Sequence, residues 1–187
     1  MRRRGPLLRQ VPRMRGAVLR DHCRRSPAAP SMELSEEWSS PVGQESRHLS
    51  DELTRQQNVA TLEAYFRLLS DLDLDAWIEL WAERCVIEAP YAPPSIPELI
   101  SGRAAVYEFY REQAAGYARL SFPNTVLQPM ADPGRVLARW YPDGELTTGA
   151  GYRNQNVGVF EFDAEGKIKR LTEYFDPAPL TTPANPS

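Results

Sequence analysis

Histidine and cysteine are scarce in this chain of 187 residues, which has two of each. Cys23 and Cys85 are too few for a disulfide framework or a zinc cluster, and they fit a reducing compartment, so we expect a cytoplasmic protein. His22 and His48 both precede the first segment that has the apolar spacing of a helix. A catalytic triad or a histidine metal site would find no histidine in the body of the chain. We therefore expect no metal and no cofactor, and acid–base chemistry would depend on carboxylates and tyrosines.

The chain also lacks a run of about 18 apolar residues, the length that a membrane-spanning helix needs. Its formal net charge is −3, from 22 basic and 25 acidic residues. Residues 1–30 hold nine arginines and one acid, which leaves 13 basic and 24 acidic residues in the rest. Nucleic acids and anionic membranes attract basic clusters. The acidic body therefore predicts neither nucleic acid nor membrane as a partner.

The arginine-rich beginning of the chain differs in composition from the rest. Residues 1–31 fit a transit segment, a basic arm or an upstream start, and a fresh acidic stretch begins at Met32, a candidate natural start. We expect residues 1–49 to be a basic leader with a disordered lead-in. A single domain is predicted over residues 50–178, followed by a flexible tail over residues 179–187.

Apolar spacing changes from a helical to a strand pattern near residue 121. Three helices are predicted first, one capped by Ser50, a short one capped by Asp73, and one from Ser101 to about Tyr117. A tight turn is predicted at residues 142–144 and another at 163–166. Strands are predicted over residues 85–89, 122–128, 135–141, 145–162 and 168–175. This order predicts an α+β fold, a cone-shaped curved antiparallel sheet wrapped over three N-terminal helices, whose open end forms an apolar pocket.

Several short motifs in this order carry a family resemblance over about residues 50–178. They include Asp75-Ala76-Trp77, Pro90-Tyr91-Ala92-Pro93-Pro94, Tyr152-Arg153-Asn154 and Glu173-Tyr174-Phe175-Asp176-Pro177. In this order and spacing the chain resembles the nuclear transport factor 2-like superfamily, and within it SnoaL-like proteins and the phenazine-biosynthesis A/B family. The fold hosts isomerases, cyclases, dehydratases, hydrolases and non-catalytic binders, so the resemblance implies the fold more strongly than an activity.

The resemblance also implies roles for individual positions. Ketosteroid isomerases of the superfamily use a tyrosine on the first helix as an oxyanion donor, and Tyr65 matches it. Their general base falls on Ala89 and their second oxyanion donor on Gly158, so two of the three catalytic groups of those enzymes are missing here. The functional glutamate of the phenazine-biosynthesis A/B family matches Glu173, while its partner histidine falls on Phe109.

Strand alternation singles out Glu173 independently of the resemblance. Leu171, Glu173 and Phe175 share one face of the last predicted strand, and this apolar face should be the concave one. A carboxyl there is desolvated, which raises its pKa and suits a general acid or base. The alternative is a structural glutamate that is satisfied by a tyrosine or by the backbone.

The other candidate residues each have an ordinary structural interpretation as well. Tyr65 is expected to donate a hydrogen bond into the pocket, or else to be a plain helix aromatic. Asn156 shares the concave parity and offers a polar contact, whereas Glu88 has the opposite parity and should face solvent. The expected ligand-binding residues are Trp81, Tyr91, Phe109, Trp140, Asn156 and Phe160.

These observations favour a small-molecule pocket protein of secondary metabolism, a field that includes antibiotic biosynthesis. The first hypothesis is a cofactor-independent isomerase, cyclase or dehydratase that acts on an aromatic or polyketide-like metabolite, with Glu173 as acid–base group and Tyr65 as hydrogen-bond donor. The alternative is a non-catalytic ligand-binding or dimerising interaction module of the same fold. A homodimer through one face of the sheet is expected in either case, partly from the resemblance and partly because an open sheet leaves one face uncovered.

Overall fold

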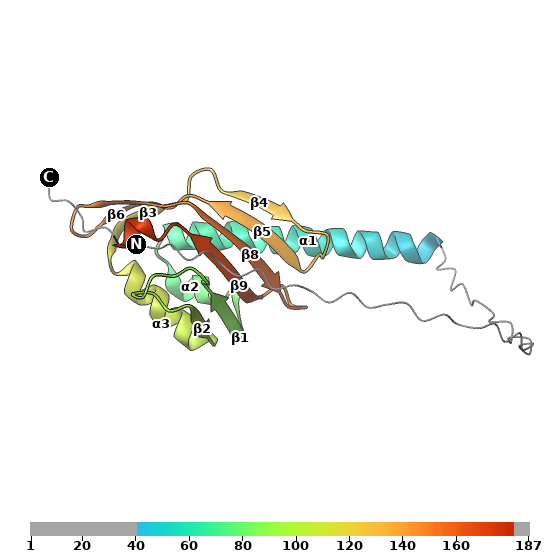
Figure 1. The fold of residues 1–187 in the computed structure, drawn as a ribbon. Helices are drawn as coiled ribbons and strands as arrows, with labels where there is room; N and C mark the ends of the chain where they lie inside the picture. Colours follow the sequence, from blue (N-terminus) through green and yellow to red (C-terminus); the bar gives the residue numbers. More distant parts are fainter. Residues whose placement is uncertain (1–40, 182–187) are drawn as a thin grey trace, which may run out of the picture. The chain divides into compact units, whose positions relative to one another are not determined.

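The structure is a computed structural model that describes residues 41–181. Helices come first and strands dominate the second half, as Figure 1 shows. Residues 1–40 of the predicted leader and lead-in, and residues 182–187 of the predicted tail, lie outside the described residues. The elements are α1 (Pro41–Ser70), α2 (Leu74–Ile78), β1 (Trp81–Glu88), β2 (Leu99–Ser101), α3 (Arg103–Ala114), β3 (Tyr117–Ser121), β4 (Val126–Pro129), β5 (Arg135–Trp140), β6 (Asp143–Leu146), β7 (Gly151–Arg153), β8 (Asn156–Phe162), β9 (Ile168–Phe175) and α4 (Ala178–Thr181).

The strands form two sheets. The larger sheet has six strands in the order β2-β1-β9-β8-β5-β4, and the smaller has three in the order β3-β6-β7. Neighbouring strands are antiparallel except β1 and β9, which run parallel. The predicted α+β fold with three helices and a curved, open, mainly antiparallel sheet is therefore confirmed.

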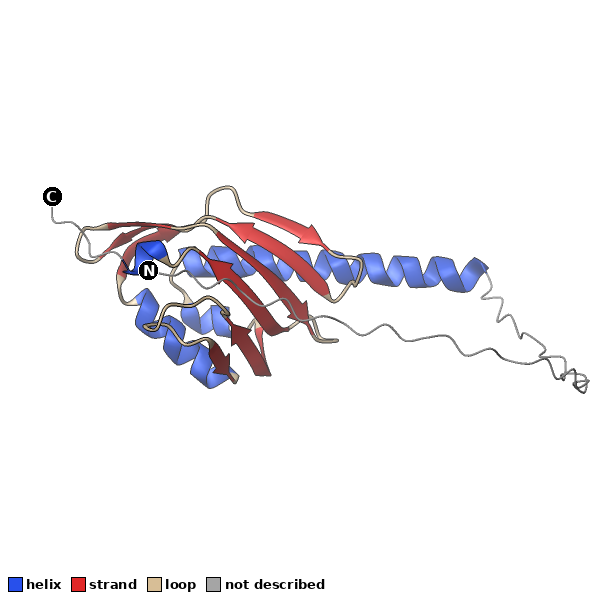
Figure 2. Cartoon of the chain, in the orientation of Figure 1, coloured by secondary structure: helices blue, strands red, loops and turns tan. Residues whose placement is uncertain are grey.

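Helices cover one face of the larger sheet (Figure 2). Helix α1 packs against β3, β4 and β5, and α3 packs against β1 and β2. The buried side of α1 presents Leu62, Tyr65, Phe66 and Leu69 to the sheet. These residues meet a core formed by Trp77, Trp81, Val106, Val136, Ala138, Phe160, Ile168 and Leu171. Burial of this apolar surface drives the helices onto the sheet.

Helix α1 starts earlier than predicted. It begins at Pro41, and Ser50 is no cap because it lies within the helix, where its carbonyl accepts a hydrogen bond from Thr54 Oγ1. The first turns present Leu49 and Leu53 to solvent, so they lack the buried stripe that marks the later turns. The apolar spacing therefore could not reveal this part of the helix, and residues 41–49 are helical rather than a disordered lead-in.

Two turn predictions had opposite outcomes. The turn at residues 163–166 is confirmed, with Gly166 at φ 75° and Asp163 Oδ1 accepting from the Lys167 amide. The tight turn predicted at residues 142–144 is wrong, because Asp143 and Gly144 pair with β3 as the start of β6. The strand predicted over residues 122–128 starts later than expected, at Val126 in β4, since residues 122–125 lie between β3 in the smaller sheet and β4 in the larger one.

Helix boundaries in the middle of the chain follow local capping. Asp73 caps α2 as predicted, with Oδ1 accepting from the Ala76 amide at 3.1 Å. Gly102, at φ 90°, precedes α3 in place of the predicted Ser101.

No helix of the described residues is long and apolar enough to span a membrane.

Gly158 lies at a crowded point of the larger sheet. It pairs with Ala138 on β5 and Glu173 on β9. A Cβ at this position would lie 2.9 Å from Leu171 Cδ1 and 3.0 Å from both the Thr172 carbonyl oxygen and Trp140 Cη2. No acidic side chain can occupy the site, so the second oxyanion donor of the ketosteroid isomerases has no room here.

We expect Gly158→Ala to lower the free energy of unfolding by about 1–3 kcal/mol, because the added methyl overpacks the core. Urea unfolding followed by circular dichroism measures the change. Gly151→Ala is the matched control, since nothing lies within 4 Å of a Cβ there. Equal stability of the two variants would contradict the crowding at β8.

Candidate functional site

A cavity of about 170 Å³ opens to solvent between the helices and the inner face of the larger sheet. Its walls come from α1, α3, β1, β8 and β9, and the smaller sheet contributes β3 and β7. An apolar cavity of about 150 Å³ holds a benzene ring, so this one has room for a ring-sized ligand. The aromatic side chains in its walls include Phe109, Tyr117, Phe122, Trp140, Tyr152 and Phe175.

Glu173 is the acidic side chain of the cavity wall. It is half-buried on β9, and Asn156 Nδ2 donates a hydrogen bond to its Oε1 at 2.6 Å. Burial raises the pKa of Glu173 from its ordinary value of 4.5 to about 7, and the hydrogen bond from Asn156 offsets part of that rise. The carboxyl therefore exists in both protonation states near neutral pH, as a proton carrier must.

Two tyrosine hydroxyls lie beside one another at the same cavity. The hydroxyl oxygens of Tyr65 on α1 and Tyr110 on α3 are 3.5 Å apart. Burial raises the pKa of both tyrosines well above their usual range, and the nearby Glu173 charge raises both further. Both hydroxyls therefore stay protonated and can donate hydrogen bonds to a ligand oxygen.

The aromatic rings behind these hydroxyls fix their positions. The Tyr65 ring lies 5.4 Å from Trp77 and 5.3 Å from Phe160, measured between centroids, and Tyr110 lies 4.4 Å from Trp77. Rings at these separations pack with favourable edge and tilted geometries. The hydroxyl pair is thus held by the core rather than by a mobile loop.

Five of the predicted site residues line the cavity together. They are Tyr65, Phe109, Trp140, Asn156 and Glu173. Strand alternation correctly placed Asn156 and Glu173 on the concave face, and Ala89 lines the same wall without offering a carboxyl. The functional role of each of these residues remains a prediction.

Three predicted ligand-binding residues lie elsewhere. Trp81 and Phe160 are fully buried in the core behind Tyr65, and neither lines the cavity. Trp81 starts strand β1, four residues before the strand predicted over residues 85–89. Tyr91 is 71% exposed and packs against Tyr174, whose side chain is on the opposite face of β9 from Glu173.

Sequence reasoning missed Tyr110, Tyr117 and Tyr152 as lining residues. Tyr110 belongs to the apolar side of the third predicted helix, and this pattern is equally typical of core packing. The ring centroids of Tyr152 and Tyr117 lie 5.9 Å apart on the smaller sheet. The sequence did not reveal this sheet as a separate layer. The available signal concerned Tyr152, because this residue follows Gly151 in a glycine-broken strand and is the first residue of the motif Tyr152-Arg153-Asn154.

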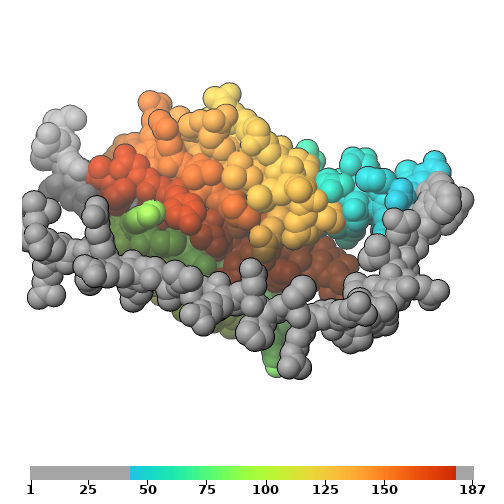
Figure 3. Space-filling model, turned by 45° about the vertical axis from the view of Figure 1, so that its right-hand side comes forward, coloured from blue at the N-terminus to red at the C-terminus, as the bar shows by residue number. Residues whose placement is uncertain are grey.

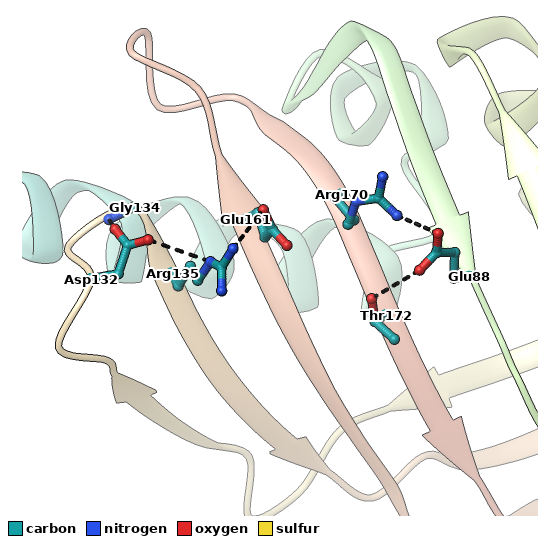
Figure 4. Close-up of polar contacts among 7 residues, drawn as sticks. All are labelled: Glu88, Asp132, Gly134, Arg135, Glu161, Arg170 and Thr172. Atoms are coloured by element: carbon teal, nitrogen blue, oxygen red, sulfur yellow. Dashed lines mark hydrogen bonds and ion pairs between the residues drawn. The ribbon is translucent and has the colours of Figure 1, made fainter. Parts of the chain in front are cut away.

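Charged side chains of the sheet gather on the face away from the cavity (Figure 4). Glu88 accepts hydrogen bonds from Arg170 and Thr172, which confirms its predicted outward parity. Arg135 pairs with Glu161 at 3.5 Å on the same face. The described residues that line the cavity include no lysine, arginine or histidine. A negatively charged ligand would therefore find no counterion there.

The chain is similar to proteins of known sequence and structure. The uncharacterized protein YesE of Bacillus subtilis is 33% identical over 118 residues, which are 63% of this chain and 80% of YesE. An uncharacterized PhzA/B-like protein of Pseudomonas aeruginosa is 25% identical over 111 residues, or 59% of this chain and 78% of that protein.

Two solved structures have the same fold. A Bacillus subtilis protein that is provisionally assigned as an isomerase superposes with a TM-score of 0.62 at 31% identity, covering 67% of this chain and 91% of that one. A provisionally assigned polyketide cyclase of Xanthomonas campestris superposes with a TM-score of 0.57 at 23% identity, covering 66% and 93%. Residues 62–171 match the profile of the SnoaL-like domain. With the fold and the cavity described above, this match shows that the chain belongs to the SnoaL-like family.

Proposed function

We propose that this protein binds an aromatic or polyketide-like ring ketone and acts on it as a cofactor-independent isomerase, cyclase or dehydratase. The observation that carries the proposal is the carboxyl of Glu173, which faces an apolar cavity with a pKa near neutral. Perturbed carboxyls concentrate at functional sites, because a proton carrier works best when its pKa lies near the operating pH.

The chemistry follows from the three groups at the cavity wall. Ionised Glu173 removes a proton from the carbon next to the ligand carbonyl, and protonated Glu173 returns it to another atom of the ligand. The hydroxyls of Tyr65 and Tyr110 donate hydrogen bonds to the carbonyl oxygen, where negative charge develops. The apolar walls lower the local dielectric constant and so strengthen these interactions.

The relatives are consistent with this class of reaction. The similar Bacillus subtilis structure carries a provisional assignment as an isomerase, and the Xanthomonas structure one as a polyketide cyclase. The alternative is binding without chemistry. It is favoured by Ala89, because the carboxyl that the ketosteroid isomerases use as their base is missing at that position.

Hydrogen exchange at a ring ketone tests the acid–base role directly. We expect the protein to catalyse deuterium incorporation next to the carbonyl of α-tetralone in heavy water. Glu173→Gln should lower that rate by about 10²-fold or more. Mass spectrometry follows the exchange, and Glu161→Gln on the outer face is the matched control. Tetralone binding without exchange would assign the protein to the binding class, and absence of binding would contradict the proposal.

The stability of the protein should depend on the ionisation of Glu173. Burial raises its pKa from 4.5 to about 7, so the folded protein holds this proton more tightly than the unfolded chain does. Stability contributed by the protonated form is therefore lost as pH rises from 4.5 to about 7, and the loss levels off above that. We expect Glu173→Gln to become more stable than the wild type over this pH range, and to remain more stable at higher pH. Tm measured against pH tests this, and a constant difference would contradict the raised pKa.

We also propose a homodimer through the outer face of β8 and β9, at the Val157 end of β8 rather than beside the charged pair of Arg135 with Glu161. Val157 and Tyr174 are cross-strand partners that are 37% and 38% exposed, and Tyr91 packs beside them. In the space-filling view, these strands form a continuous surface (Figure 3). Burial of this apolar group would favour association.

Sedimentation is expected to give about twice the chain mass of 21.2 kDa. The Val157→Arg variant should be monomeric where the wild type is a dimer, because the substitution places an unpaired charge at the interface. Glu112→Arg, a charge change on the exposed face of α3, should leave the dimer intact. A wild-type monomer at all concentrations would refute the dimer.

A further inference from the structure

Asn156 is only 8% exposed, and one of its polar atoms has no hydrogen-bond partner among the described residues. Asn156 Nδ2 donates to Glu173 Oε1 at 2.6 Å. The other amide atom, Oδ1, is buried and accepts no hydrogen bond from any described residue. Native proteins rarely leave a buried acceptor unpaired, because it has lost its water and gained nothing in return. A donor from outside the chain would explain this atom.

The orientation of the amide follows from Glu173. An ionised carboxylate only accepts hydrogen bonds, so the amide must turn Nδ2 towards it, and Oδ1 points elsewhere. The residues beside Asn156 in the sheet are Trp140 on β5 and Phe175 on β9. Both line the cavity together with Asn156, and neither supplies a donor to Oδ1.

The charges of the cavity wall restrict which kind of ligand group can donate a hydrogen bond to Asn156 Oδ1. The described lining residues include no basic side chain, so a carboxylate on the ligand would be buried without a counterion next to Glu173. A hydroxyl group has a proton to donate and carries no charge. It satisfies Oδ1 and introduces no repulsion with the glutamate.

We propose, on the basis of the proposed function, that the ligand is a ring ketone bearing a hydroxyl group and no carboxylate, and that Asn156 selects it by accepting the hydroxyl hydrogen bond at Oδ1. The ketone oxygen then faces the hydroxyls of Tyr65 and Tyr110. Asn156 thereby contacts the ligand and Glu173 at the same time, with one amide atom for each.

Asn156 also positions Glu173 and sets its protonation. Tyr65 on α1, Tyr110 on α3 and Tyr152 on β7 face the carboxyl as titratable groups, and Asn156 on β8 is the described residue that hydrogen-bonds to it. That bond lowers the Glu173 pKa against the effect of burial. Removing the amide should therefore move the pH profile of tetralone exchange upward.

Pairs of substituted tetralones test the selection. The probes are α-tetralones with a hydroxyl at each aromatic position in turn, each paired with the methyl compound of the same shape and with the carboxylate. At about pH 8, where Glu173 is mainly ionised, at least one hydroxyl compound should bind about tenfold more tightly than its methyl partner. Every carboxylate should bind more weakly than the parent ketone. Calorimetric titration measures the affinities.

Variants of Asn156 assign the effect to this residue. Asn156→Leu should bring the hydroxyl-to-methyl ratio close to one, retain binding of the parent tetralone, and shift the exchange profile to higher pH. Asn156→Ala serves if the leucine variant unfolds, and Glu161→Gln should keep the wild-type ratio. This inference is overturned if the hydroxyl preference persists in both Asn156 variants, or if the wild type shows no preference. The proposed function still holds in that case, provided that the wild type binds the parent tetralone and catalyses its exchange. Loss of all tetralone binding in the wild type overturns both.

Discussion

The register between β8 and β9 decides which chemistry this cavity can contain. It sets Gly158 opposite Glu173 and Asn156 opposite Phe175, so the carboxyl and the amide point to the same side while the charged pairs of the sheet point away. A slip of one residue would turn every side chain of a strand to the other face. The crowding around Gly158 is part of the same arrangement, since Leu171 and Trp140 occupy the space that a Cβ at this position would need.

Within that register, the properties of Glu173 come from two opposing influences. Desolvation favours the neutral acid, and the amide of Asn156 favours the anion. Their balance leaves a carboxyl that changes its protonation near neutral pH without any histidine. The two buried tyrosines keep their protons chiefly because burial disfavours their anions as well, and the charge of Glu173 raises both pKa values further.

Period-two alternation was sufficient to predict the inward face of β9 from Leu171 and Phe175, and it placed Asn156 correctly as well. It failed for Phe160, which has the right parity but lies further along β8, under the ring of Tyr65. Parity says which face a residue occupies, and the depth along that face depends on which helix packs there. The start of α1 and the smaller sheet could not be predicted for a related reason. Leu49 lies on turns without a buried stripe, and Asp143-Gly144 has the composition of a turn although it pairs as a strand.

The parallel pairing of β1 with β9 has a consequence for how the protein is made. Trp81 lies beside Ile168 and Ile87 beside Leu171, so strands from the two ends of the domain are neighbours in the middle of the sheet. Contacts between residues so distant in sequence form slowly, and a chain emerging from the ribosome has to wait for its last strand. Until then β1 and β8 both present unpaired edges, and the apolar wall that will surround Glu173 is open to water. The strand that carries the carboxyl of Glu173 is thus also the strand that joins β1 to β8, so a chain that ends before β9 lacks both the carboxyl and the joined sheet.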